Sequence, residues 1–228
     1  EYTIGIDMGT TVVYNVLVAK RRRMVKRMLV LCVYCLCPVY AGYDDGLISA
    51  GEYEWGVELF GGTLVVDGGG ANRIEARNSS KVEVYSTSSP LGTGVGGIMD
   101  LMLTNTSRLD YYGGITQELL IGKDATAHLQ GGRIDGISSA QYVTWVNGEP
   151  TGQHIFIYAR DGWEWKYENG KIRGIAGLWL DSGTPFDIRF TTLYEPDYDP
   201  VWANVKVVPE PVSLLLMALG GLLLRRRH

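Results

Sequence analysis

The chain has 228 residues, of which 46% are hydrophobic and 20% charged, so it has enough apolar side chains to bury a core and is not intrinsically disordered. Its 30 glycines show no three-residue period, which excludes a collagen-like fibre. The formal net charge is −4, but residues 42–211 hold 12 basic and 23 acidic residues, and this excess of negative charge argues against nucleic acid as a partner.

The first forty residues contain the pattern of an export signal. Five basic residues within 21–27 precede an apolar run at 28–37, and Ala41 is a small residue of the kind after which a signal peptidase cleaves. Ten helical residues rise about 15 Å, too short to cross a bilayer. We therefore expect residues 24–41 to be a cleaved signal peptide and residues 1–23 to be an extension upstream of the native start; a buried helix of a cytosolic fold is the alternative. All three cysteines lie in this segment, so the mature chain would contain no thiol.

From residue 42 to about residue 140, apolar residues recur as doublets separated by one polar position, which is the period of a β-strand. The positions Leu64, Val82, Leu109 and Ala127 are equivalent and follow one another at intervals of 18, 27 and 18 residues. A nine-residue outward loop at 86–94 accounts for the longer interval.

Polar corners separate the doublets, at residues 77–80, 104–107 and 122–124. Asn, Asp, Ser and Thr favour turns through local hydrogen bonds, and Asn tolerates a positive φ. A repeat of about 18 residues with short strands and polar corners predicts an all-β fold, specifically a β-solenoid over residues 42–140 whose coils bury their inward side chains against one another. An antiparallel sandwich built from hairpins of similar length is the alternative.

After residue 140 the spacing changes to that of hairpins. Strands are expected at residues 142–146, 155–159, 163–167, 172–180, 186–190 and 201–208, with turns that include Asn147-Gly148 and Asn169-Gly170. We expect residues 141–208 to form an antiparallel β cap, because the open end of a solenoid needs cover. Five of the six tryptophans fall in this cap, where they serve either core packing or a ligand surface.

The repeats place charged residues at equivalent outward positions. Lys81 and Arg108 are equivalent, as are Glu83 and Asp110, so we expect a ladder of salt bridges on a solvated face. His128 follows Asp110 in its row and is expected to be solvated. Because no catalytic constellation and no His or Cys pair with metal-ligand spacing is found, we expect no catalytic residue, no cofactor, no metal site and no enzymatic activity.

An acidic cluster of Glu195, Asp197 and Asp199 precedes the last expected strand. Carboxylates so placed could hold Ca²⁺. Prolines are interleaved with them, which favours a solvated loop, and binding of Ca²⁺ or a sugar to the cap stays open.

The last twenty residues form a second targeting signal. The motif Pro209, Glu210 and Pro211 is followed by an apolar stretch at 212–224 and then by Arg225, Arg226 and Arg227. Thirteen helical residues rise about 20 Å, less than the roughly 30 Å of hydrocarbon in a bilayer, so the stretch is at most a marginal transmembrane helix. The arginines favour the cytoplasmic side, which places the body outside; an ordinary tail anchor is the alternative.

This order of motif, short helix and arginines closely resembles the PEP-CTERM sorting signal of exported bacterial proteins, also catalogued as an ice-binding-protein C-terminal domain. The resemblance covers residues 209–228. It implies that an exosortase, an integral-membrane processing enzyme, recognises Pro209, Glu210 and Pro211. It further implies transient anchoring in the inner membrane and then delivery to the cell surface or the extracellular space, in a bacterium that makes exopolysaccharide.

We therefore expect an exported, non-catalytic structural or interaction protein of the cell surface or extracellular matrix, with exosortase as its processing partner and exopolysaccharide as a further partner. The expected fold is all-β, with short apolar helices in the signal peptide and the tail. The alternative is a carbohydrate-binding module or a carbohydrate-active enzyme of the β-helix type. Carboxylates converging in a cleft lined by Trp163 or Trp179 would distinguish that alternative.

Overall fold

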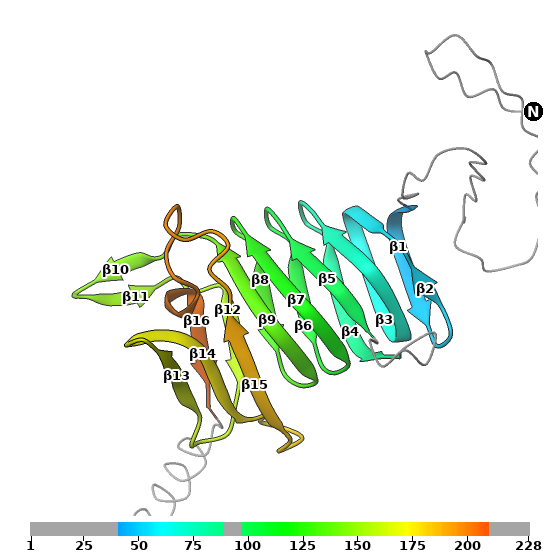
Figure 1. The fold of residues 1–228 in the computed structure, drawn as a ribbon. Coiled ribbons are helices and arrows are strands. Elements are labelled where there is room, and N and C mark those ends of the chain that lie inside the picture. The colour runs from blue at the N-terminus through cyan, green and yellow to red at the C-terminus, as the bar shows by residue number, and fades with distance from the viewer. Residues whose placement is uncertain (1–40, 89–96, 210–228) are drawn as a thin grey trace, which may run out of the picture.

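The computed structural model describes residues 41–88 and 97–209, with the backbone alone for residues 41–44. This part of the chain is mostly β-structure, as the sequence predicts (Figure 1). Its first nine strands are β1 (Ala41–Ser49), β2 (Tyr53–Glu54), β3 (Val57–Ala76), β4 (Lys81–Thr87), β5 (Ile98–Leu103), β6 (Arg108–Tyr111), β7 (Ile115–Gly122), β8 (Thr126–Leu129) and β9 (Arg133–Ala140). The later elements are β10 (Thr144–Val146), β11 (Glu149–Thr151), β12 (Ile155–Tyr158), β13 (Glu164–Glu168), β14 (Lys171–Leu178), β15 (Pro185–Phe190), the 3₁₀ helix η1 (Val201–Asn204) and β16 (Val205–Val208).

Fourteen strands of the described residues join in one sheet, whose neighbours are mostly parallel. The long strand β3 takes part in two parallel ladders (Figure 1). The first half of β3 pairs with β4, and β6, β8, β12 and β16 continue from β4; we call these strands the first ladder. The second half of β3 pairs with β5, and β7 and β9 continue from β5; these strands form the second ladder. Each circuit of the chain up to β9 therefore contributes one strand to each ladder.

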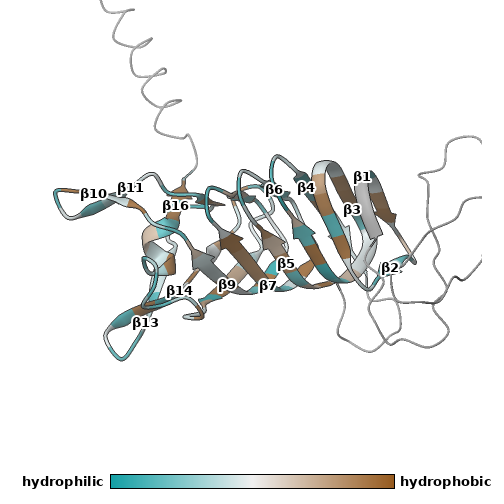
Figure 2. Ribbon diagram, turned by 90° about the horizontal axis from the view of Figure 1, so that it is seen from above, coloured by the Kyte–Doolittle hydropathy of each residue, from teal (hydrophilic) through white to brown (hydrophobic). Residues whose placement is uncertain are grey.

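Apolar residues meet rung by rung inside the ladders. Leu64 pairs with Val82, Val82 with Leu109, and Leu109 with Ala127, and all four side chains are fully buried. The second ladder has an equivalent buried row, formed by Ile74, Leu101, Leu119 and Ile137. Figure 2 shows apolar and polar residues alternating along several of these strands. The predicted register is thus confirmed, and these strands pair in parallel, unlike the hairpins of the sandwich alternative.

Left-handed backbone conformations form the corners between the ladders. Asn78 and Asn105 have φ of 55° and 57°, and the amide of Asn105 donates a 3.1 Å hydrogen bond to the side-chain oxygen of Asn78 on the preceding turn of the chain. The predicted polar corners are therefore present, and asparagine takes the positive φ that it tolerates. Lys123, at the third corner, has a φ of 49° although its side chain has no such preference.

The region after residue 140 combines both kinds of pairing. Antiparallel hairpins form around the Asn147-Gly148 and Asn169-Gly170 turns, and β14 pairs with β15 in the antiparallel sense. Strands β12 and β16 instead extend the first ladder in parallel, with Ile155 between Ala127 and Val205. β12 joins the first ladder because Ile155 and Ile157 pair with the buried residues Ala127 and Leu129 of β8 and are themselves buried.

The two segments expected to act in targeting lie almost wholly outside the described residues. The apolar helices expected at 28–37 and 212–224 belong to these parts of the chain. Within residues 41–88 and 97–209, no helix is long and apolar enough to traverse a bilayer.

Replacing Leu109 with Asp should unfold the protein, because an unpaired charge would enter the buried row of the first ladder. We expect a loss of at least about 4 kcal/mol in the free energy of unfolding, measured by urea denaturation. Leu178→Asp is the matched control, since Leu178 is 42% exposed, and it should shift the transition little. Equal effects of the two substitutions would contradict the assigned core.

Replacing Lys123 with Asn should stabilise the protein, because asparagine adopts a positive φ at lower cost than lysine. The expected gain is about 0.5 kcal/mol, seen as a higher melting temperature. Lys206→Asn, on the extended strand β16, should bring no such gain. A loss of stability in Lys123→Asn would show that the lysine side chain has a role of its own at this corner.

Candidate functional site

The motif expected to direct sorting begins at the last described residue. Pro209 is exposed and directly follows β16, the last strand of the first ladder. Glu210, Pro211, Arg225, Arg226 and Arg227 lie outside the described residues. At the other end, the expected cleavage residue Ala41 is the first residue of β1 and pairs with Val57.

The outward charges of the first ladder form a connected network. Lys81 Nζ lies 3.0 Å from a carboxylate oxygen of Asp110 across the rungs and also binds Glu83. Arg108 holds Asp110 from its own strand, with 2.8 Å between Nη2 and Oδ1. Asp110 is only 2% exposed, so its surroundings differ from the solvated position that the sequence suggests. Burial alone would raise the pKa of Asp110, but the hydrogen bonds from Arg108 and Lys81 outweigh it and lower that pKa.

The His128 side chain is half-buried, which corrects the expectation of a solvated residue. Its ring stacks on that of Phe156 with 4.9 Å between centroids, and Nδ1 lies 3.0 Å from the Tyr158 hydroxyl. Burial, and then the positive charge of Arg108, lower the pKa of His128, while Asp110 acts against them. These contacts hold a neutral imidazole in the packing of the ladder.

Two members of the acidic cluster before β16 make internal contacts, whereas Asp197 is exposed. Asp199 accepts hydrogen bonds from the backbone N–H of Val143 at 2.9 Å and from the indole N–H of Trp145 at 3.2 Å. Glu195 lies 3.3 Å from Arg173. Among the residues that the structure describes, no group of three His, Cys, Asp or Glu side chains is arranged to hold a metal ion.

The two tryptophans proposed to line a cleft lie within the packing of this region. Trp179 is fully buried and its indole N–H donates a 2.8 Å hydrogen bond to the carbonyl of Gly132. Trp163 is half-buried and lies edge-on against Trp165, with ring centroids 5.2 Å apart. Trp179 therefore packs in the core and does not line a ligand cleft.

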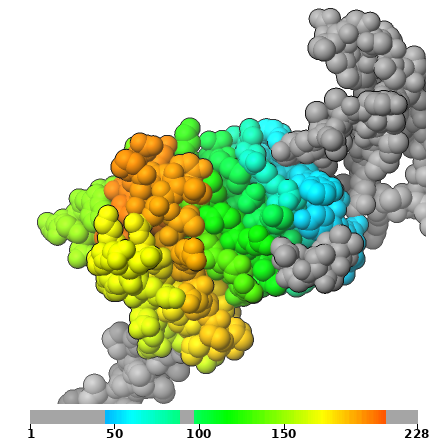
Figure 3. All heavy atoms as spheres, viewed as in Figure 1, coloured from blue at the N-terminus to red at the C-terminus, as the bar shows by residue number. Residues whose placement is uncertain are grey.

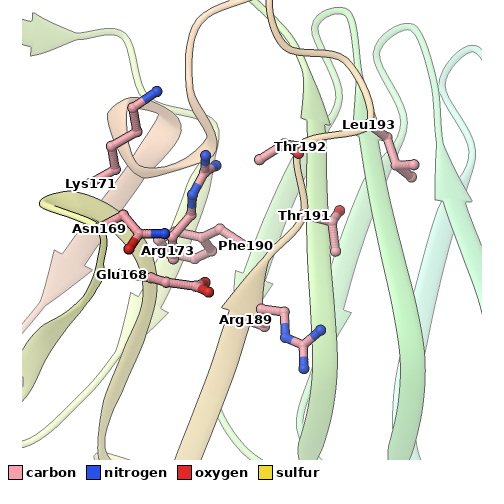
Figure 4. Close-up of a pocket in the computed structure, with 9 residues that line it drawn as sticks. All are labelled: Glu168, Asn169, Lys171, Arg173, Arg189, Phe190, Thr191, Thr192 and Leu193. Atoms are coloured by element: carbon pink, nitrogen blue, oxygen red, sulfur yellow. The ribbon is translucent and has the colours of Figure 1, made fainter.

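A shallow hollow that the sequence did not indicate lies between the β13–β14 turn and the chain that ends β15. Its volume is about 640 Å³, and Figure 4 shows its lining residues. Lys171 and Arg173 come from β14 and Arg189 from β15, while Glu168 supplies the one carboxylate of this lining. Figure 3 shows this face in space-filling form, with the yellow strands β13 and β14 beside the orange chain after β15. Strand alternation alone could not have placed Lys171 and Arg173 on one side, because the pairing of β14 with β13 shifts register between Ile172 and Gly174.

Comparisons with known proteins bring no further information on this site. No family model matches the chain, and neither a curated protein nor a solved structure matches it.

Replacing Asp110 with Asn should lower the free energy of unfolding at pH 7 by about 1–3 kcal/mol, because the two cations lose a charged partner. Since the pKa of Asp110 is lowered by folding, its contribution is complete above about pH 4 and is lost as the pH falls through the folded-state pKa. The difference between the two proteins, measured by chemical denaturation from pH 7 to pH 2, should therefore shrink at acidic pH. Asp124→Asn, at an exposed corner, should leave the profile unchanged. A difference that does not depend on pH would argue against the charge network.

Proposed function

We propose that this chain is an exported, non-catalytic structural or interaction protein of the cell surface or extracellular matrix, sorted and processed through its C-terminal tail by an exosortase. The observation that carries the proposal is the place of the tail. The motif Pro209, Glu210 and Pro211 begins where the last strand ends, and Pro209 is exposed. A processing enzyme needs an extended, accessible segment, and proline on either side of the glutamate keeps this segment out of regular strands and helices.

We infer that the two ladders are the faces of a β-solenoid. Three observations support this: the parallel pairing, the alternation of the chain between the ladders, and the buried rows in which successive turns of the chain are in register. Such a body suits a structural role outside the cell, because stacked turns form a stable scaffold without cysteines. The signal peptide at 24–41 and the short helix at 212–224 are part of the same proposal.

The alternative function, a carbohydrate-active enzyme, requires carboxylates that converge in a cleft lined by Trp163 or Trp179. Among the described residues, Trp179 is fully buried, and Trp163 is half-buried and packs against Trp165. The carboxylates of Asp110, Glu195 and Asp199 are engaged in internal bonds. Binding of a carbohydrate partner remains part of the proposal, at a different surface.

Sorting is tested by replacing Pro209, Glu210 and Pro211 together with alanine in the native bacterium. Without the recognition motif, the protein should stay full-length and remain with the inner membrane, whereas the parent protein is shortened and released. Immunoblots of membrane, surface and medium fractions measure the outcome.

The matched control for this experiment replaces Glu149 and Pro150 with alanine. These residues have the same types and lie in the hairpin strand β11, with Glu149 exposed. The control should be processed like the parent protein. Normal shortening and release of the triple variant would remove the sorting role of the motif.

A further inference from the structure

The hollow beside β14 and β15 differs in charge from the rest of the body. Three cations, Lys171, Arg173 and Arg189, surround it together with a single carboxylate, Glu168 (Figure 4). Residues 42–211 as a whole carry almost twice as many acidic as basic residues. A local excess of positive charge on an acidic body attracts an anion to this place and repels it from the surroundings.

Two of these cations have no internal partner. Among the described residues, neither Arg189 nor Lys171 forms a hydrogen bond or an ion pair through its side chain, whereas Lys166 nearby binds Asp187 at 2.6 Å. Arg173 is half-buried, and Glu195 fixes one of its terminal nitrogens at 3.3 Å. A free guanidinium presents donors in a planar fork that fits both oxygens of a carboxylate.

The neighbouring groups suit a sugar ring. Asn169 and Thr192 are exposed at the hollow and offer an amide and a hydroxyl for hydrogen bonds to sugar hydroxyls. Tyr167, which is 66% exposed, lines an adjoining depression together with Arg173 and Arg189 and offers an aromatic face for stacking. Asp135 and Asp187 also line this depression, but they are paired with Arg133 and Lys166, which leaves Glu168 as its unpaired carboxylate among the described residues. A nucleic acid, with a phosphate at each residue, would extend from the hollow onto the acidic surface and be repelled there.

We propose that this hollow binds a polysaccharide that carries carboxylate groups, with Arg189 and Lys171 contacting a carboxylate and Tyr167 contacting the ring of a sugar. The proposal rests on the proposed function, since only an exported chain meets such a polymer outside the cell. Glu168 opposes the bound charge and limits the affinity. Binding and sorting are nevertheless separate properties and can fail separately.

The test uses calorimetry to measure binding of the purified full-length chain in detergent to a partially methyl-esterified oligogalacturonate, whose widely spaced carboxylates suit a basic hollow within an acidic surface. The fully methyl-esterified oligomer is the matched neutral probe, because it keeps the sugar and removes the charge. Arg189→Ala and Lys171→Ala should each weaken binding, Arg189→Ala by about tenfold. Glu168→Gln should strengthen binding, and binding of the parent protein should weaken as the salt concentration rises.

Lys206→Ala is the matched control, because Lys206 is an exposed lysine on β16 that does not line the hollow. Its affinity should equal that of the parent protein, and circular dichroism should show that every variant is folded. Failure of the acidic oligomer to bind, or equal effects of Lys206→Ala and Lys171→Ala, would overturn the proposal. Equal binding of the methyl ester, of single-stranded DNA or of anionic lipid vesicles would also overturn it. None of these results would bear on processing of the tail, which the fractionation experiment tests alone.

Discussion

Parallel strands pair residue for residue, so a ladder can bury one row of side chains only if every strand in it is apolar at the same position. Leu64, Val82, Leu109 and Ala127 satisfy this condition although 63 residues separate the first from the last. Each buried leucine or valine contributes about 1.5–3 kcal/mol relative to an exposed one, and a shift of one residue would turn the whole row toward solvent. The corners and the charged face depend on this register, because it determines which residues become neighbours across the ladder.

The charged network shows how an outward position can become buried without losing its charge. Lys81 and Arg108 cover Asp110 from two rungs and supply its hydrogen bonds. A buried carboxylate costs several kcal/mol unless such partners are present, so these three residues act as one unit. The same register places His128 against Phe156, where a neutral aromatic ring is favoured.

Sequence reasoning predicted much of the fold because the fold is locally encoded. The 18-residue spacing of Leu64 and Val82 predicts that these residues pair in neighbouring strands, and the asparagines indicate where the chain turns. The burial of Asp110 could not be seen, because it depends on how long side chains from neighbouring strands lie over it. The parallel pairing of β12 and β16 was also missed, since Ile155 and Val205 lie 50 residues apart with an antiparallel unit between them. The hollow combines two residues of β14 and two of β15 with the β13–β14 turn and the chain after β15, and no motif in the sequence joins these segments.

The pairing of Val82 with Leu109 across 27 residues has a consequence for how this chain can vary. This turn of the chain is nine residues longer than the turns before and after it, yet the rungs on both sides keep their pairing. Natural variants could therefore differ in length here while sharing an unaltered interior. For the same reason, residues inserted between β4 and β5 should leave the pairing of the packed rows unchanged.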